Sequence, residues 1–391
     1  MAIVVAMSIL PAALDIFRTT LPIRVFQHAA ADRHVAEAIV VRLHLTDGRA
    51  GWGEALPRPY VTGETLDSVV EDLRRIFWPA LCRCRSEQAL RETVADLPCL
   101  DGERVVTAAR CAAELAVLGA YGLSWAGITR RRRPAIPPVT GVLGSRDPKR
   151  TARQVRWMRR YGLRHFKLKL GFDDATDEAN LQAVHRPLRR LLARGRVSLR
   201  VDVNGRWKFK EVVERVDALR AYDVTAVEQP CPVRASQLTA LAYDCSLPLI
   251  ADESCLTAAD ADILFGAEGR IWLNLRLAKN GGILPTARLA RQAAAERVPF
   301  VVGCLVGESG ILSRAQRALL AAVPPAWAVE GNYGRGLLRD DLVVPSPRFG
   351  YGGLLHVTGA ERLSPSLRSD KLECYALRLC RLDPVDVESD G

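Results

Sequence analysis

The stretch His165–Gly171, which reads HFKLKLG, decides how the rest of the chain is interpreted. Apolar and basic residues alternate in it, which predicts a short β-strand with its large apolar side chains on one face and Lys167 and Lys169 on the other. Two ammonium groups held side by side disfavour each other's protonated form, so we expect at least one of these lysines to be available as a base. A half-exposed strand with a solvated lysine face is the alternative interpretation of the pattern alone.

Three short apolar runs downstream each end in acidic residues, and Asp202, Glu228 and Asp252 stand at these ends. The steps are 33 residues from Lys169 to Asp202, then 26 and 24 residues, each about the length of one strand, one helix and their loops. Residues 211–220, which lie between two of the runs, have the apolar spacing of a helix. A parallel array with carboxylates at its strand ends is typical of a (β/α) barrel with its site on the C-terminal face.

Three carboxylates from neighbouring strands would converge at that face, and this donor set predicts a metal site. Oxygen ligands alone suit Mg²⁺, or Mn²⁺, rather than zinc. None of the six histidines is spaced like a pair of metal ligands. The sequence therefore predicts a magnesium-dependent enzyme.

Five motifs, in order, resemble those of the enolase superfamily, in its muconate lactonizing enzyme subgroup (mandelate racemase/muconate cycloisomerase). They are Lys167-x-Lys169, Asp202-x-Asn204-x-x-Trp207, Glu228-Gln-Pro, Asp252-Glu253-Ser, and Lys279-x-Gly281-Gly282. The resemblance covers most of residues 20–360.

The resemblance implies a fold, a reaction and roles for residues. The fold would be α/β, a TIM-like (β/α) barrel beneath an α+β N-terminal capping domain. Family members remove a proton from the carbon beside a carboxylate, and Mg²⁺ stabilises the resulting enediolate. By resemblance, Asp202, Glu228 and Asp252 are the metal ligands, Lys169 is the base and Lys167 is its electrostatic neighbour.

One position departs from the family pattern. The sixth barrel strand is predicted at residues 271–279, and the subgroup's second catalytic lysine falls at Arg276. A guanidinium group is effectively never deprotonated, so it can stabilise negative charge but is a poor proton acceptor. Lys279 cannot simply substitute, since it lies three residues further on, has the opposite strand parity and is expected in the following loop.

The remaining candidate site residues concern the substrate. We expect two cap loops, residues 18–29 and 57–65, to contribute Arg24, Arg58 and Tyr60 as contacts to an anionic substrate, the alternative being ordinary surface or packing roles. Asn204 and Lys279 complete the substrate-binding candidates. Glu308, in the loop after the seventh strand, is a candidate hydrogen-bond partner or secondary acid, with an ordinary loop glutamate as the alternative.

A chain of 391 residues with 49% hydrophobic residues fits one barrel and an additional module. We predict a capping domain at 1–134, the barrel at 135–345 and a C-terminal return to the cap at 346–391. Within the cap, residues 35–54 predict a β-hairpin that turns at Asp47-Gly48, and helices are expected from Thr65 and near 105–122.

Charge and cysteine content bear on partners and location. The net charge of +11 and the run Arg130–Arg133 raise nucleic-acid binding as a remote alternative, but the other basic residues are dispersed and no aromatic-rich RNA-binding motif accompanies them. We therefore expect neither nucleic-acid nor membrane partners. Ten cysteines without paired spacing predict reduced thiols in a cytoplasmic protein, and a homo-oligomer is expected.

The apolar run at residues 2–10 is short and has no basic lead, so it does not predict a secretion signal. We interpret it as an N-terminal strand or as an over-extended start, with Met1 and Met7 both possible initiators.

The function predicted from the sequence is that of a magnesium-dependent enzyme acting on a small-molecule carboxylate. Because Arg276 is unsuited to the second acid–base role, a muconate-cycloisomerase-like isomerase or an acid dehydratase is favoured over an amino-acid or dipeptide epimerase (racemase), which is the alternative. A catalytically inactive relative is a further alternative. Converging carboxylates argue against it, because a structural scaffold has no need of them.

Overall fold

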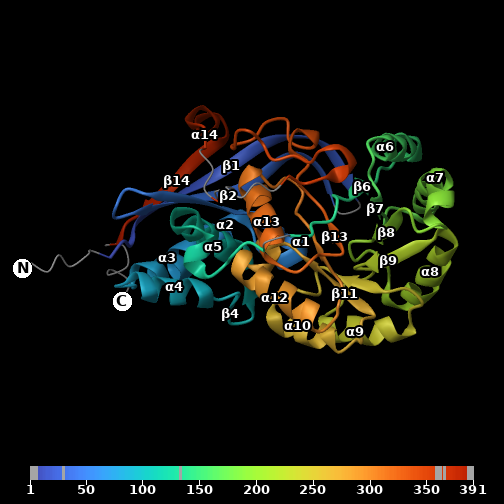
Figure 1. Ribbon diagram of the computed structural model, residues 1–391, viewed down its shortest axis with the longest axis horizontal. Coiled ribbons are helices and arrows are strands. Elements are labelled where there is room, and N and C mark those ends of the chain that lie inside the picture. Colours follow the sequence, from blue (N-terminus) through green and yellow to red (C-terminus); the bar gives the residue numbers. More distant parts are fainter. Residues whose placement is uncertain (1–7, 29–30, 132–133, 357–362, 364–366, 385–391) are drawn as a thin grey trace, which may run out of the picture.

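A computed structural model describes residues 8–28, 31–131, 134–356, 363 and 367–384. It places a barrel of strands and helices beside a module built from both ends of the chain (Figure 1). Of the run at residues 2–10, residues 2–7 lie outside the described part, as do Arg132 and Arg133 of the basic tetrad.

The barrel consists of eight parallel strands that follow one another in sequence order. They are β6 (Gly141–Leu143), β7 (His165–Lys169), β8 (Ser198–Asp202), β9 (Val224–Glu228), β10 (Leu249–Ala251), β11 (Ile271–Leu275), β12 (Phe300–Val302) and β13 (Ala328–Val329). A parallel bridge between Val139 and Val329 joins the two edges, where the Thr140 amide donates to the Val329 carbonyl at 2.7 Å. The predicted (β/α) barrel is confirmed.

Helices connect the strands and cover their outer faces. They are α6 (Pro148–Arg160), α7 (Asp174–Leu192), η3 (Phe209–Glu211), α8 (Val212–Ala218), η4 (Leu219–Tyr222), α9 (Ala235–Asp244), α10 (Ala258–Phe265), α11 (Leu277–Asn280), α12 (Ile283–Ala295) and α13 (Gly310–Ala322). Because helices cover one face and the barrel closes the other, both faces of β7 are buried. Lys167 is 1% exposed and Lys169 is 8% exposed, which excludes the solvated lysine face.

The capping module is an antiparallel sheet with helices on one side, as predicted. Its strand order is β14 (Ala376–Leu382), β1 (Pro11–His28), β2 (Ala31–Leu45) and β3 (Ala50–Ala55). Its helical and minor elements are α1 (Pro59–Thr62), α2 (Leu66–Asp72), η1 (Leu73–Phe77), α3 (Trp78–Cys82), α4 (Glu87–Asp96), β4 (Leu100–Asp101), β5 (Arg104–Val105), α5 (Thr107–Tyr121) and η2 (Leu123–Ala126).

Several predicted cap elements are confirmed. Strands β2 and β3 form the expected hairpin, with Arg42 opposite Trp52. The Thr65 side chain caps α2 by accepting from the Ser68 amide at 3.0 Å, and the Ser68 hydroxyl caps in return. Helix α5 is the expected alanine-rich helix, and its residues 107–118 are buried.

The expected loop at residues 18–29 is wrong for the described residues 18–28, which continue β1 as a strand paired with β2. This segment contains no glycine and no Asn-Gly or Asp-Gly turn, and its β-branched residues favour extended backbone. Its one proline, Pro22, coincides with a register irregularity and does not end the strand.

The C-terminal tail completes the cap, as predicted. After η5 (Gly334–Gly336) and η6 (Tyr351–Gly353), helix α14 (Ser369–Tyr375) leads into β14, which pairs antiparallel with β1 from Leu14–Leu382 to Thr19–Ala376. Figure 1 shows this red segment beside the blue N-terminal strands. The numerical domain bounds remain predictions.

The helices and the cysteines bear on the predicted absence of membrane spans and disulfides. None of the helices in the described ranges is both long and apolar enough to cross a membrane. No disulfide bond links any of the ten cysteines, all of which lie within the described ranges.

Glu54, at the end of β3, docks the cap onto the barrel at the start of α13. Its buried carboxyl group accepts from the Ser309 amide at 3.0 Å, the Ser309 hydroxyl at 2.6 Å and the Leu312 amide at 3.2 Å. These donors include amides of the first helical turn, which have no partner within the helix. The cap therefore has a polar anchor beside the loop that follows β12.

This anchor predicts a pH-dependent stability. Burial raises the pKa of Glu54 to about 7, despite the opposing hydrogen bonds from Ser309. A carboxyl group whose folded pKa lies above its unfolded pKa stabilises the fold fully below the unfolded value and loses that contribution as the pH rises through the folded value. The free energy of unfolding of the wild type, relative to Glu54→Gln, should therefore fall by about 2 kcal/mol from pH 5 to pH 8.

Urea unfolding at both pH values measures this difference, with the exposed Glu103→Gln as the matched control. A difference between wild type and Glu54→Gln that stays constant with pH would contradict the prediction.

Candidate functional site

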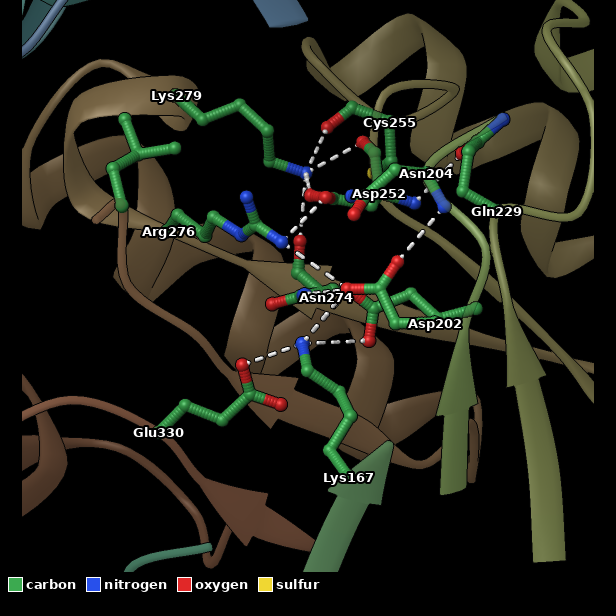
Figure 2. A network of polar contacts seen from close by, with 12 residues as sticks. Lys167, Asp202, Asn204, Gln229, Asp252, Cys255, Asn274, Arg276, Lys279 and Glu330 are labelled. Carbon is green, nitrogen blue, oxygen red and sulfur yellow. Dashed lines mark hydrogen bonds and ion pairs between the residues drawn. The ribbon is translucent and has the colours of Figure 1, made fainter. Parts of the chain in front are cut away.

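The carboxyl ends of the barrel strands carry a network of buried charged side chains. Lys167 and Lys169 lie at the end of β7, Asp202 ends β8 and Glu228 ends β9. Asp252 directly follows β10, Arg276 directly follows β11 and Glu330 directly follows β13. Figure 2 labels Lys167, Asp202, Asp252, Arg276 and Glu330, whose side chains point toward one another from separate strands.

Lys169 is held at the edge of this network. Its ammonium group lies 2.8 Å from Asp202 Oδ2 and 2.9 Å from Asn204 Oδ1. Asn204 has a positive φ of 49°, a conformation that asparagine tolerates better than most residues, and its amide donates to Asp202 Oδ1 at 3.0 Å. The loop after β8 therefore fixes both partners of Lys169.

Lys167 lies among three carboxylates. Its Nζ is 2.6 Å from Glu330 Oε2 and 3.2 Å from both Asp202 Oδ2 and Glu228 Oε1. Burial alone would lower the pKa of Lys167, but Glu228, Glu330 and Asp202 outweigh it and raise that pKa well above its usual range. The three carboxylates thus favour the protonated form of Lys167, and of the predicted pair Lys169 is the candidate base.

Asp202 is the counter-charge of both lysines. Burial would raise its pKa, but the ammonium groups of Lys169 and Lys167 outweigh burial and hold the pKa well below its usual range. For Glu228, burial and the Asp202 carboxylate dominate and raise the pKa to about 7, although Lys167 opposes them. The two neighbouring carboxyl groups therefore differ in how easily they lose a proton.

Arg276 occupies the side of the barrel opposite Lys169, since three strands separate β7 from β11 in either direction. Its Nη2 lies 2.5 Å from Asp252 Oδ2 and 3.2 Å from Glu228 Oε1. Gly303, after β12, leaves room for this side chain, because a Cβ there would lie 3.1 Å from Arg276 Cγ and 2.2 Å from Asn274 Oδ1. Burial would lower the pKa of Arg276, but Asp252 and Glu228 raise it far above its normal value.

The three predicted metal ligands come from successive strands, are fully buried and offer only oxygen donors, which fits Mg²⁺ chemically. Both Asp252 carboxylate oxygens are buried without a well-formed hydrogen bond. Within the described ranges, however, no three acidic, histidine or cysteine side chains form a ready-made metal site. Arg276 instead bridges Glu228 and Asp252, so an ion could take its place only if the guanidinium withdrew.

Two of the predicted substrate residues, Lys279 and Arg58, are buried and donate to backbone carbonyl groups. Lys279 is 0% exposed, and its ammonium group donates to the carbonyls of Asp252 and Asn274 at 2.7 Å and of Cys255 at 2.9 Å. Lys279 thus fixes the backbone that carries Asp252 and also pairs with Asp252 Oδ1 at 3.2 Å (Figure 2). These contacts explain its position without a substrate, and its role in substrate binding stays a prediction.

Arg58 is also buried. It donates to the carbonyls of Pro57 at 2.7 Å and Val306 at 2.8 Å, which ties the cap to the loop after β12. The predicted substrate contact of Arg58 is not supported by this placement, and a cap–barrel tie explains it. The sequence alone does not distinguish an arginine that joins the cap to the barrel from one that contacts a substrate.

A cavity of about 280 Å³ opens onto the network and gathers the other substrate candidates. Arg24, Tyr60 and Asn204 line it, together with Lys167, Lys169 and Arg276. Tyr60 is 41% exposed, as expected for a residue at the cavity mouth. Their contact with a substrate remains a proposal.

Glu308 lies in the loop after β12, where it was expected, and its carboxyl group accepts from the Leu305 amide at 2.7 Å. Burial raises the pKa of Glu308 to about 8, so it is largely protonated at neutral pH. It is not among the residues that line the cavity, while Leu305 is. A role in positioning Leu305 fits these contacts better than a direct acid role.

Sequence reasoning missed Glu330 and Asn274. Glu330 pairs with Lys167 and accepts from Arg200 at 3.1 Å, and Asn274 donates to Glu228 Oε1 at 2.8 Å. A signal for Glu330 was present in the sequence, because this acidic residue follows the apolar pair Ala328-Val329, much as Asp202 and Glu228 end apolar runs. Asn274 shares the strand parity of Arg276, which could have marked it as facing the same side.

Residues 150–360 match the family model described as "Enolase C-terminal domain-like". The N-succinyl-L-Arg/Lys racemase of Bacillus cereus is 29% identical over 288 residues, which span 71% of this chain and 74% of that protein.

Two solved structures share the fold. The muconate lactonizing enzyme of Pseudomonas fluorescens, complexed with muconolactone, superposes with a TM-score of 0.81 and 25% identity over 94% of this chain and 99% of its own. The dipeptide epimerase of Cytophaga hutchinsonii, complexed with Mg and the dipeptide D-Ala-L-Val, has a TM-score of 0.77 and 18% identity over 95% and 99%.

Proposed function

Since this chain belongs to the enolase C-terminal domain-like family, and with it to the enolase superfamily, we propose that it is a racemase or epimerase of an amino-acid derivative that works by removing the proton beside a carboxylate. The observation that carries the proposal is the position of Lys169, whose ammonium group lines the cavity between Asp202 and Asn204. The racemase and epimerase names of relatives support this class over the cycloisomerase or dehydratase favoured by sequence reasoning.

Lys169 is proposed to take the α-proton. A general base must lie within hydrogen-bond reach of the proton it removes, and Lys169 reaches the cavity while Asp202 and Asn204 fix its orientation. Lys167 stays protonated among its three carboxylates and contributes a fixed positive charge.

Asp202, Glu228 and Asp252 are the proposed ligands of Mg²⁺. When bound, the ion would supply positive charge that stabilises the negative charge developing on the substrate carboxylate. The Mg named in the Cytophaga hutchinsonii epimerase complex supports this assignment. In this chain, Arg276 must leave Asp252 for the ion to enter, and it would then be released toward the cavity that it lines.

Because of Arg276, the groups on the two faces of the substrate differ in their ability to accept a proton. Lys169 can both accept and return a proton, whereas the guanidinium opposite is a poor proton acceptor. This observation favours a second candidate function, a one-face reaction of the cycloisomerase or dehydratase type, in which Arg276 only stabilises charge.

The two candidates differ in a measurable way. A single enantiomer of an N-acyl amino acid, incubated with enzyme and Mg²⁺ in D₂O, should gain deuterium at least about tenfold faster than it inverts, because Lys169 exchanges its proton readily while delivery from the Arg276 face is slow. Arg276→Lys should bring the two rates together by supplying a second base. NMR and chiral chromatography follow the two rates.

Deuterium entering with complete retention at long times would favour the one-face candidate. Inversion as fast as exchange in the wild type would contradict the proposed inequality of the two faces, and no deuterium uptake from any member of an N-acyl amino acid and dipeptide panel would contradict the proposed function.

A further inference from the structure

A second cavity lies at the end of the barrel opposite the charged network, beside helices α6 and α7. The network occupies the carboxyl ends of the strands, whereas Arg164 and Arg196 lie in the loops that lead into β7 and β8. Arg159, in the last turn of α6, joins them, and all three line one cavity of about 500 Å³. Figure 1 shows α6 and α7 side by side. Three arginines from three different segments therefore surround one space.

The cavity is positively charged, and no carboxylate compensates that charge. Within the part of the chain that the structure describes, none of the residues that line the cavity is acidic. The side chains of Arg159, Arg164 and Arg196 are exposed and form no hydrogen bond or ion pair with a described residue. Their charge acts on the nearby barrel, because burial lowers the pKa of His165 and the guanidinium groups of Arg200 and Arg164 lower it further. This arrangement favours a multiply charged anion as ligand.

Helix dipoles do not account for the whole set of arginines. A basic side chain in the last turn of a helix interacts favourably with the helix dipole, which explains Arg159. The effect falls off within the last turn, whereas Arg164 and Arg196 follow the ends of α6 and α7. The Arg196 amide donates to the Leu191 carbonyl group at 2.8 Å, but this contact uses only the backbone. The guanidinium groups of Arg164 and Arg196 therefore need another explanation.

An exposed aromatic ring forms another part of the cavity wall. Tyr351, in η6, is 69% exposed, and Leu354, which also lines the cavity, is 53% exposed. The turn that carries Tyr351 is fixed against the end of α6, because the Gly352 amide donates to the Tyr161 carbonyl group at 2.8 Å. Gly162 leaves room for the Tyr351 ring, since a Cβ there would lie 3.0 Å from it. A ring held exposed in this way offers a face on which a planar group can stack.

We propose that this cavity binds a phosphate ester that carries an aromatic ring, such as a nucleoside diphosphate. Guanidinium groups match phosphate oxygens with paired N–H donors, and three of them can compensate a multiply charged phosphate group. The ring would lie against Tyr351 and the apolar side chains of Leu163, Leu191 and Leu354. A volume of about 500 Å³ is within the range of small-molecule sites. The site is separate from the catalytic cavity and does not depend on the reaction proposed there.

Three probes separate the contribution of charge from that of the ring. ADP carries both, pyrophosphate carries the charge alone and adenosine carries the ring alone. Calorimetric titration in EDTA, which keeps Mg²⁺ from linking a probe to the catalytic carboxylates, should show ADP binding at least about tenfold more tightly than either of the others. Equal affinities for ADP and pyrophosphate would indicate an adventitious ion only, and that result or a lack of ADP binding would overturn the proposal.

Two variants assign these contributions to residues. Arg164→Ala combined with Arg196→Ala should weaken both ADP and pyrophosphate by about 100-fold, or roughly tenfold for each lost charge-assisted contact. Tyr351→Ala should weaken ADP by about fivefold to tenfold and leave pyrophosphate unchanged, because it removes only the stacking surface. All three side chains are exposed, so the fold should persist. An unchanged ADP affinity in either variant would overturn the proposal.

Two further variants are controls. Arg194→Ala, which removes an exposed arginine outside the cavity lining, should bind ADP as the wild type does. Arg150→Ala removes a cation from the catalytic cavity and should also keep the wild-type affinity. An equal loss in Arg194→Ala would indicate diffuse attraction, and a loss in Arg150→Ala would place ADP in the catalytic cavity, so either would overturn the proposal. Tighter binding of a single-stranded oligonucleotide than of ADP would also overturn it, in favour of a nucleic-acid partner.

Discussion

Replacement of Lys169 by methionine is expected to lower the rate of isomerisation by about 10³-fold or more, because it removes the candidate general base and leaves the rest of the cavity intact. Methionine is similar in length and fills the partly buried position, so the fold should persist. Polarimetry on an N-acyl amino acid gives the rate, and urea unfolding verifies the fold.

Substrate binding gives an independent check of the same variant. Lys169→Met should bind N-succinylglycine within about tenfold of the wild type, since the loss concerns the chemical step. Lys149→Met, an exposed lysine on α6, is the control and should behave as the wild type does. An isomerisation rate that stays within tenfold of the wild type in Lys169→Met would show that another group is the base.

Asp252→Asn should abolish activity by weakening Mg²⁺ binding about 100-fold or more. The substitution replaces one of the three carboxylates with a neutral amide. A hard cation such as Mg²⁺ depends on charged oxygen donors, so it should bind more weakly. The substitution should also free Arg276, whose 2.5 Å contact is with Asp252 Oδ2. Calorimetric titration with Mg²⁺ measures the affinity directly, and EDTA should abolish activity until Mg²⁺ is restored.

Asp244→Asn, an exposed acid on α9, provides the control for a general change in charge. Wild-type Mg²⁺ affinity in Asp252→Asn, or full activity of the wild type in EDTA, would refute the ligand assignment. Unchanged activity in Asp244→Asn together with a loss in Asp252→Asn would locate the ion at the strand ends.

The residues at the strand ends could be predicted because acidic residues recur in the sequence at the ends of short apolar runs, at regular spacing. Asp202, Glu228 and Asp252 each stand at the end of a short buried strand, at the spacing of one βα unit. The structure brings all three into one network with Lys167, Lys169 and Arg276. The parity of residues along β11 was also enough to place Arg276 in the network, whereas Lys279 joins it from α11 through Asp252.

The contacts of long side chains could not be predicted in the same way. Arg58 and Lys279 are cations in plausible positions, yet each donates to backbone carbonyls of neighbouring loops, and those loops meet only in the folded barrel. The protonation of Lys167 likewise depends on Glu330, which is 163 residues away in sequence and reaches it across the closed barrel. The repulsion between the two lysines was expected to lower a lysine pKa. At Lys167 it is outweighed by carboxylates from distant parts of the chain.

The extent of β1 is a further example of what local patterns leave open. Residues 18–22 and 26–28 are extended because β2 pairs with them on both sides of an irregularity in register, and this pairing depends on a partner outside the segment. Burial and pairing, rather than local composition, fix such elements.

The central claim is that Lys169, at this strand end, removes an α-proton in a reaction that needs the three carboxylates. The most direct measurement is NMR of the α-proton signal of an N-succinyl amino acid in D₂O, with wild type and Mg²⁺, with wild type and EDTA, and with Lys169→Met and Mg²⁺. The signal should disappear only in the first sample. Disappearance at an undiminished rate with EDTA would show that the reaction does not need the metal, and disappearance at an undiminished rate in Lys169→Met would show that Lys169 is not the base.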